Sequence, residues 1–168
     1  MEIAAMLKIP MPSPIGAFFD RILTLGWYDG ITDGLVCSPS ELIAFRFDIL
    51  AWGPCQDQRV FAFSPISISM FDDVVRLLGK LGPPEWPCWH AKWPSDSIEA
   101  DLLSQELNKI PAGAEKPSLV IETESMFKTI YSVRQLSGES VDLIPDHFSG
   151  IPRSDNYDYW HQYLGLSN

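Results

Sequence analysis

The residues best suited to recognition are concentrated in the segment 82–96, where three tryptophans flank a histidine. Trp86, Trp89, His90 and Trp93 lie within eight residues of one another. An indole ring combines a large apolar face with one polar edge, and such side chains are favoured at recognition surfaces. We predict that this Trp-rich loop is a binding site built from these four residues. The alternative is that the loop closes the end of a hydrophobic core.

Two side chains of the same loop, Cys88 and His90, are of types that bind zinc. A zinc site needs three or four ligands in tetrahedral reach, so Cys37 and Cys55 would have to converge on this pair. The separations allow that convergence, but nothing in the sequence requires it, and there is no CxxC spacing. We therefore predict no metal site and no cofactor.

A histidine-based catalytic site would have to come from the C-terminal region, where Asp146 precedes His147 and His161 adds a second imidazole. Nucleophilic catalysis needs a nucleophile, a histidine base and a carboxylate that orients the base. The sequence contains no GxSxG elbow, and HExxH, GxxxxGK[ST] and GxGxxG are also absent. We assign no catalytic residue, and we favour binding over catalysis.

Two groups of carboxylates have simpler structural interpretations. Glu122 and Glu124 share one strand face at period two, and paired carboxylates can act as acid and base, but on an edge strand they are usually solvated. The segment 28–34 contains two Asp-Gly pairs and lacks the acid spacing of an EF-hand loop. Asp-Gly is a frequent turn sequence, so we predict turns at both pairs, Asp29-Gly30 and Asp33-Gly34.

Charge and composition restrict the partners that such a protein can have. The chain has 168 residues, of which 46% are hydrophobic, and its formal net charge is −10. This composition is typical of a globular protein, and the length suits one domain over 1–168. An acidic surface repels phosphate backbones and anionic lipids, so we expect neither a nucleic-acid nor a membrane partner. It suits a basic protein partner, unless the charge serves solubility alone.

The cysteines and the N-terminus indicate the compartment. Three cysteines are too few, and odd in number, for a secreted disulfide scaffold. The first apolar stretch is short and is interrupted by Lys8 and Pro10, unlike a secretory signal. No apolar run approaches the length of a membrane span. We expect a cytoplasmic protein with free thiols.

The elements that would position these residues begin with a run of β-strands at about 22–28, 35–37, 42–52 and 59–63. The clearest of them, 42–52, alternates in hydrophobicity with period two. One face carries Ile43, Phe45, Phe47, Ile49 and Ala51, and the other carries Arg46 and Asp48. Short links between consecutive strands predict an antiparallel meander.

Two helices follow, at about 70–81 and 97–109. Ser69 is positioned to cap the first, and Asp96 with Glu99 three residues later resembles a capping box at the second. The second helix is predicted to bury one apolar stripe, made of Ile98, Leu102, Leu103, Leu107 and Ile110.

The remaining segments complete the expected sheet and its edges. Residues 1–20 are predicted to form an extended arm, because prolines are frequent between positions 10 and 14. Strands are predicted at 119–121 and 127–136, with a helix as the alternative for the latter. The aromatic segment 157–164 is predicted to form one short helix that docks through its rings.

Together these elements predict a two-layer α+β domain. It would contain a mainly antiparallel sheet of four to six strands with two principal helices on one face. Phe45, Phe47, Leu78 and Leu103 would then share one hydrophobic core.

Two functions suit this architecture. The first is a protein-binding or inhibitory role without catalysis, such as an immunity protein or antitoxin performs. The alternative is a small-molecule sensor or enzyme with an aromatic pocket near the Trp-rich loop.

Overall fold

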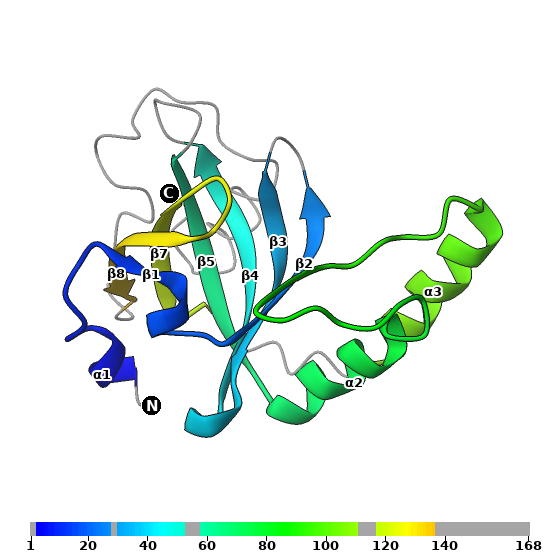
Figure 1. Ribbon diagram of the computed structural model, residues 1–168, viewed down its shortest axis with the longest axis horizontal. Coiled ribbons are helices and arrows are strands. Elements are labelled where there is room, and N and C mark those ends of the chain that lie inside the picture. Colours follow the sequence, from blue (N-terminus) through cyan, green and yellow to red (C-terminus); the bar gives the residue numbers. More distant parts are fainter. Residues whose placement is uncertain (1–2, 28–29, 53–57, 111–116, 137–168) are drawn as a thin grey trace, which may run out of the picture.

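The protein is built on one eight-stranded sheet (Figure 1). The computed structural model describes residues 3–27, 30–52, 58–110 and 117–136. The strand order is β1-β8-β7-β5-β4-β3-β2-β6, and the sheet is mixed because β6 runs parallel to β2 while the other neighbours are antiparallel. The strands are β1 (Ser13–Pro14), β2 (Arg21–Trp27), β3 (Ile31–Ser38), β4 (Ile43–Trp52), β5 (Gln58–Ile66), β6 (Cys88–His90), β7 (Leu119–Glu124) and β8 (Thr129–Gln135).

Helices lie on both faces of this sheet. The described residues contain α1 (Ile3–Met6), α2 (Ile68–Leu78) and α3 (Ser97–Lys109), with 3₁₀ turns at Ile15–Ala17 and Pro39–Glu41. The N-terminal segment with α1 lies on one side of the strands, and α2 and α3 lie on the other (Figure 1). None of these helices combines the length and the apolarity required to cross a lipid bilayer.

The sheet is curled into a half-barrel. Ile22 of β2 and Ile130 of β8 belong to the same buried cluster, although four strands separate β2 from β8 in the sheet. In a flat sheet these two strands would be roughly 24 Å apart, at about 4.8 Å per step. Register shifts in the β2–β3, β4–β5 and β7–β8 pairs supply local bends, since a bulge increases twist and kinks a strand.

The concave side of the half-barrel holds an aromatic core. Phe47 is its centre, with ring-centroid distances of 4.8 Å to Phe127 and 5.5 Å to both Phe61 and Phe63. The N-terminal segment closes this side, because Met6, Ile15, Phe18 and Phe19 are buried in the same cluster. The phenylalanine rings of this cluster account for most of the largest fully buried side chains of the described residues.

The predicted two-layer α+β architecture with one core is wrong. Phe45 and Phe47 lie in the concave core, whereas Leu78 and Leu103 belong to a second cluster on the convex face. The sheet therefore separates two cores, and eight strands rather than four to six form it. The physical reason is that β5 is buried continuously from Val60 to Phe63, which happens when both faces of a strand are covered.

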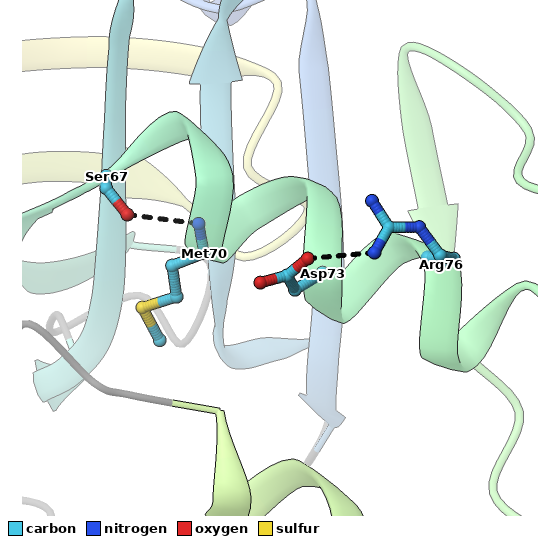
Figure 2. A network of polar contacts seen from close by, with 4 residues as sticks. All are labelled: Ser67, Met70, Asp73 and Arg76. Carbon is cyan, nitrogen blue, oxygen red and sulfur yellow. Dashed lines mark hydrogen bonds and ion pairs between the residues drawn. The ribbon is translucent and has the colours of Figure 1, made fainter.

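Helix α2 begins two residues earlier than predicted, and its cap is Ser67 rather than Ser69. The Ser67 hydroxyl accepts a hydrogen bond from the Met70 backbone N–H at 3.0 Å (Figure 2). One turn later, an exposed Arg76–Asp73 pair spans 2.9 Å along the helix. Such pairs contribute only about 0.3–0.5 kcal/mol, so burial of α2's apolar face on the sheet holds the helix in place.

Helix α3 has the predicted bounds and the predicted cap, but not the predicted buried stripe. Asp96 accepts hydrogen bonds from the backbone N–H groups of Ile98 and Glu99. Leu103 is buried against the convex core, while Ile98 is 69% and Leu102 55% exposed. The predicted stripe covers about half of the helix circumference at 3.6 residues per turn, which is too wide for one packed face.

The other predicted strands are confirmed with changed boundaries. The meander β2–β3–β4–β5 is antiparallel throughout. Asp33-Gly34, predicted to be a turn, instead lies inside β3, so that the expected short strand at 35–37 is eight residues long. Residues 129–135 form a strand and not a helix, while Phe127 lies in the preceding turn with φ +59°. The segment 157–164 falls outside the described residues.

Both edges of the sheet are short and bounded by prolines. The predicted N-terminal arm supplies α1 and β1, and β1 contributes only two residues beside β8. The Trp-rich loop supplies the opposite edge, where β6 has three residues and directly follows Pro87. Short, proline-flanked edges oppose uncontrolled strand pairing with other chains.

Candidate functional site

Pairing of β6 with β2 determines where each residue of the Trp-rich loop lies. The parallel register places Cys88 beside Ile22, Trp89 beside Leu23 and His90 beside Thr24. Because side chains alternate across a strand, Trp89 and His90 point to opposite faces of the sheet edge. The predicted four-residue site is therefore divided into a buried part and an exposed part.

Trp89 and the half-buried Trp86 form the part that packs against the core, as the alternative interpretation of the loop predicts. Trp89 is buried in the convex core, and its ring meets Trp86 edge-on at 6.0 Å. Trp86 also lies 6.0 Å from the ring of Phe71 on α2, and the Arg21 guanidinium sits 5.6 Å from its centroid. These two indoles attach the loop to helix α2.

His90, Trp93 and Trp27 form the exposed part, which we call the aromatic rim. The rings of Trp27 and His90 meet edge-on at 5.5 Å. The Trp93 indole N–H donates to the Leu25 carbonyl at 3.4 Å, so that Trp93 lies against the backbone of the same strand that carries Trp27. Trp27 is 49% exposed and Trp93 41% exposed.

A buried threonine fixes the histidine of the rim. The Thr24 hydroxyl and Nδ1 of His90 are hydrogen-bonded at 2.8 Å, and Thr24 itself is buried. The strand register sets this contact, since Thr24 and His90 are direct neighbours across β2 and β6. The imidazole therefore has one defined orientation at the edge, with its other ring atoms toward solvent and Trp27.

An open groove of about 480 Å³ borders the rim. It runs between the end of α2 and the Trp-rich loop, and it is lined in part by Leu81, Glu85, Trp89, His90 and Lys92. His90 belongs both to the groove and to the rim. The groove brings two of the four predicted residues, Trp89 and His90, together with one acidic and one basic side chain, and it is partly open to solvent.

Sequence reasoning missed Trp27 as a site residue. Trp27 falls near the end of the predicted strand 22–28. Its contact with His90 could not be foreseen, because Trp27 is far from the Trp-rich loop in sequence. The available signal was its position: an aromatic residue at the end of a predicted strand, just before the sequence Asp29-Gly30, is expected where the sheet reaches solvent.

Of the two described cysteines, Cys88 lines the same groove as His90, and Cys37 lies apart from them. Cys37 is buried in the convex core, whereas Cys88 is exposed at the β6 edge. Burial raises the pKa of the Cys37 thiol to about 11, despite the opposing effect of Arg21. Although the residue is exposed, partial desolvation of its thiol also raises the pKa of Cys88, and Lys128 acts in the opposite direction. Within the described ranges, no three His, Cys, Asp or Glu side chains are placed to hold a metal ion, and Cys55 lies outside them.

The two glutamates of β7 serve the fold. The Glu124 carboxylate accepts hydrogen bonds from the backbone N–H groups of Met126, at 2.7 Å, and of Lys128. It thereby closes the turn that delivers Phe127 to the concave core. Glu122 is buried and accepts a hydrogen bond from the Ser132 hydroxyl at 3.3 Å. The candidate pair Asp146 and His147, with His161, falls outside the described residues.

A second hollow, not anticipated from the sequence, lies between the convex face and helices α2 and α3. It measures about 370 Å³ and is lined mainly by apolar side chains, with Asp33 and Arg46 as its charged members. Arg46 Nε lies 3.1 Å from Oδ2 of Asp48, a buried residue. Asp48 also stands directly opposite Asp33 in the β3–β4 register, so that a second negative charge lies near its carboxylate.

This arrangement predicts a pH-dependent effect of Asp48→Asn. Burial raises the pKa of Asp48 above its ordinary 3.8, and Asp33 adds to this while Arg46 opposes it. The folded state therefore keeps a proton that the unfolded chain releases, so stability present at low pH is lost as pH rises through the folded pKa. The Asp48→Asn variant does not lose this stability, because its side chain carries no titrating proton. We expect the free energy of unfolding of Asp48→Asn, minus that of wild type, to increase from pH 4 toward pH 7.

Urea denaturation at a series of pH values measures this difference directly. Asp73→Asn, which removes one carboxylate from an exposed ion pair on α2, is the matched control for the loss of a negative charge. A difference between Asp48→Asn and wild type that stays constant across this pH range would contradict the prediction.

The fold and the site together define a class: a curled, mixed-sheet domain that presents fixed aromatic side chains at one edge. No protein family matches the chain, and neither a curated protein nor a solved structure shows significant similarity to it. The function must therefore be inferred from the geometry of the molecule.

Proposed function

We propose that this chain is a binding protein that recognises a basic partner protein through the aromatic rim. The observation that carries the proposal is the exposure of two tryptophans, Trp27 and Trp93, at the same sheet edge. Exposed tryptophan is costly in water, and tryptophan is among the residues that contribute most to protein–protein affinity. His90, edge-on to Trp27, adds a polar group to the same surface.

The rim is organised before any partner arrives. Thr24 orients His90, the edge-on contact positions Trp27, and the Leu25 carbonyl holds the indole N–H of Trp93. Binding by side chains that are already ordered loses less conformational entropy. Behind the rim, the buried Trp89 and the half-buried Trp86 fix the loop to the convex core and so support this order.

Charge and shape support a protein partner over a small molecule. The net charge of −10 favours encounter with a basic surface and would increase the association rate. Small-molecule sites are usually well enclosed and mainly apolar, whereas the groove beside the rim is partly open and is lined by the polar side chains of Glu85, His90 and Lys92 as well as by apolar ones. The free thiols of Cys37 and Cys88 suit a reducing compartment, so we assign this binding to the cytoplasm.

Affinity capture with matched baits tests the proposal. Wild-type protein, Trp27→Ala/Trp93→Ala and the exposed-site control Leu42→Ala are immobilised in parallel and exposed to lysate from the source cells. A protein retained by wild type and control but not by the rim variant is purified, and its Kd is measured by calorimetry at low and high salt. We expect the rim variant to weaken binding at least about tenfold, and high salt to weaken it further.

The controls separate a rim defect from misfolding. Leu42 is 80% exposed, so its truncation leaves both cores intact. Thermal unfolding of the rim variant should remain close to that of wild type. If every purified partner bound the rim variant as tightly as wild type, the aromatic rim would not be the recognition surface.

A further inference from the structure

Helix α3 carries two apolar side chains that belong to neither hydrophobic core of the described structure. Its first two turns expose Ile98 and Leu102, one helical turn apart, on the side away from the buried Leu103. We call this pair the α3 ridge. In Figure 1 the beginning of α3 projects beyond the strands, so that this ridge lies at the far end of the molecule from α1. Adjacent exposed aliphatic residues on a projecting helix are typical of an interaction surface.

Acidic side chains flank the ridge on both sides. At 3.6 residues per turn, Asp101 lies on one side of the Ile98–Leu102 line, and Glu99 and Glu106 lie on the other. All three are exposed. Lys109, at the end of the helix, is paired with Glu106 at 2.9 Å. Lys109 offsets the charge of Glu106, and Glu99 and Asp101 therefore leave one negative charge on each side of the apolar line.

Helix α3 is already folded in the free protein, with Ile98 and Leu102 at the spacing that binding in a groove requires. Asp96 satisfies two of the free N–H groups at its beginning, with distances of 2.9 Å to Ile98 N and 3.0 Å to Glu99 N. Leu103 anchors its other face in the convex core. An amphipathic helix that binds in a groove uses anchors spaced three or four residues apart, as Ile98 and Leu102 are. No folding is required on binding.

We infer that the α3 ridge inserts into an apolar groove, bordered by Lys or Arg, on a basic partner protein. The acidic side chains beside the ridge favour a basic partner protein over a second copy of this chain. In a second copy of this chain, two ridges facing each other would bring Glu99 and Asp101 close to the same acidic residues of the partner copy, and like charges at an interface are unfavourable. This inference rests on the proposed function in requiring a partner, but it assigns a different surface.

Site-specific photocrosslinking followed by reconstitution tests the inference. Benzoylphenylalanine replaces Leu102 in the full chain, and a second version carries it at the exposed control position Leu42. After irradiation in source-cell lysate, the adduct specific to position 102 is identified and its partner is purified. We expect the cross-linked peptide to be apolar with neighbouring Lys or Arg, and Ile98→Ala/Leu102→Ala to weaken the measured Kd at least about tenfold.

The outcomes distinguish this inference from the proposed function. Loss of binding in Ile98→Ala/Leu102→Ala supports the ridge, whatever the rim variant does. Loss in Trp27→Ala/Trp93→Ala with full binding by the ridge variant overturns the ridge and leaves the rim. An adduct between two copies of this chain, with a dimer by light scattering that the ridge variant abolishes, also overturns it, as does the absence of any adduct specific to position 102.

Discussion

Replacing Gly34 with alanine is expected to destabilise the protein by about 3 kcal/mol or more, at the upper end of the range for overpacking. A Cβ atom at this position would lie 2.1 Å from the Leu23 carbonyl oxygen and 2.9 Å from Cζ of Phe47. The first of these is a backbone atom of β2, so no side-chain rotation relieves the clash. Strands β2 and β3 would have to separate where Gly34 pairs with Thr24.

The same substitution should also disturb the aromatic rim, because β2 carries both Thr24 and Trp27. We expect Gly34→Ala to lower the midpoint of chemical denaturation and to change the fluorescence of the folded state. Gly82→Ala is the matched control, since nothing lies within 4 Å of the Cβ position there. Equal denaturation midpoints for the two variants would show that β2 and β3 do not approach each other as closely as described.

Local patterns predicted the elements that depend on local interactions. The alternation of residues 42–52 correctly placed Phe45 and Phe47 on one face of β4, because a strand's periodicity is a property of its own backbone. The bounds of α3 followed from Asp96 and from the proline that comes after Ile110, since caps and breakers act within one turn. Ser67 and Ser69 were harder to distinguish, because both are serines preceding an apolar residue.

Features that depend on distant contacts were not predictable in this way. Strands β1 and β6 contain two and three residues, too few to show a period, and they exist only because β8 and β2 offer free edges. The convex core was overlooked because alternation in β4 suggested one buried face, while the continuous apolar run of β5 indicated two. A local pattern does not reveal which face a helix will cover, and for that reason Ile98 and Leu102 were expected to be buried.

The sequence identified the loop that contains the candidate site, but not which of its tryptophans face solvent. Residue type correctly attracted attention to the Trp-rich loop, but type alone does not separate indoles that anchor a loop from indoles that face solvent. The parallel β2–β6 register makes that separation, placing Trp89 in the convex core and His90 beside Thr24. The same register brings Trp27 to His90 across more than sixty positions of sequence. The rim is thus a consequence of the fold.

The concave core should be the principal source of stability, and Phe47→Ala is its most direct test. Phe47 is fully buried and contacts the rings of Phe61, Phe63 and Phe127. Truncation leaves a cavity that stacked aromatic neighbours on hydrogen-bonded strands can fill only in part. We expect a loss of about 3–5 kcal/mol, the usual cost of Phe→Ala in a core. For a chain of this size that corresponds to a decrease in Tm of roughly 6–20 °C.

Chemical denaturation of Phe47→Ala, Phe47→Leu and Leu42→Ala separates packing from general effects. Phe47→Leu keeps most of the buried volume and should cost about 1.5 kcal/mol or less. Leu42→Ala removes a side chain that is 80% exposed and should change stability by less than about 0.5 kcal/mol. In this order of stabilities, Phe47→Ala is far less stable than the other two variants. The order follows only if the half-barrel closes around one packed aromatic cluster. Similar losses for Phe47→Ala and Leu42→Ala would mean that the strands are held together by the convex core alone, since that core contains neither residue.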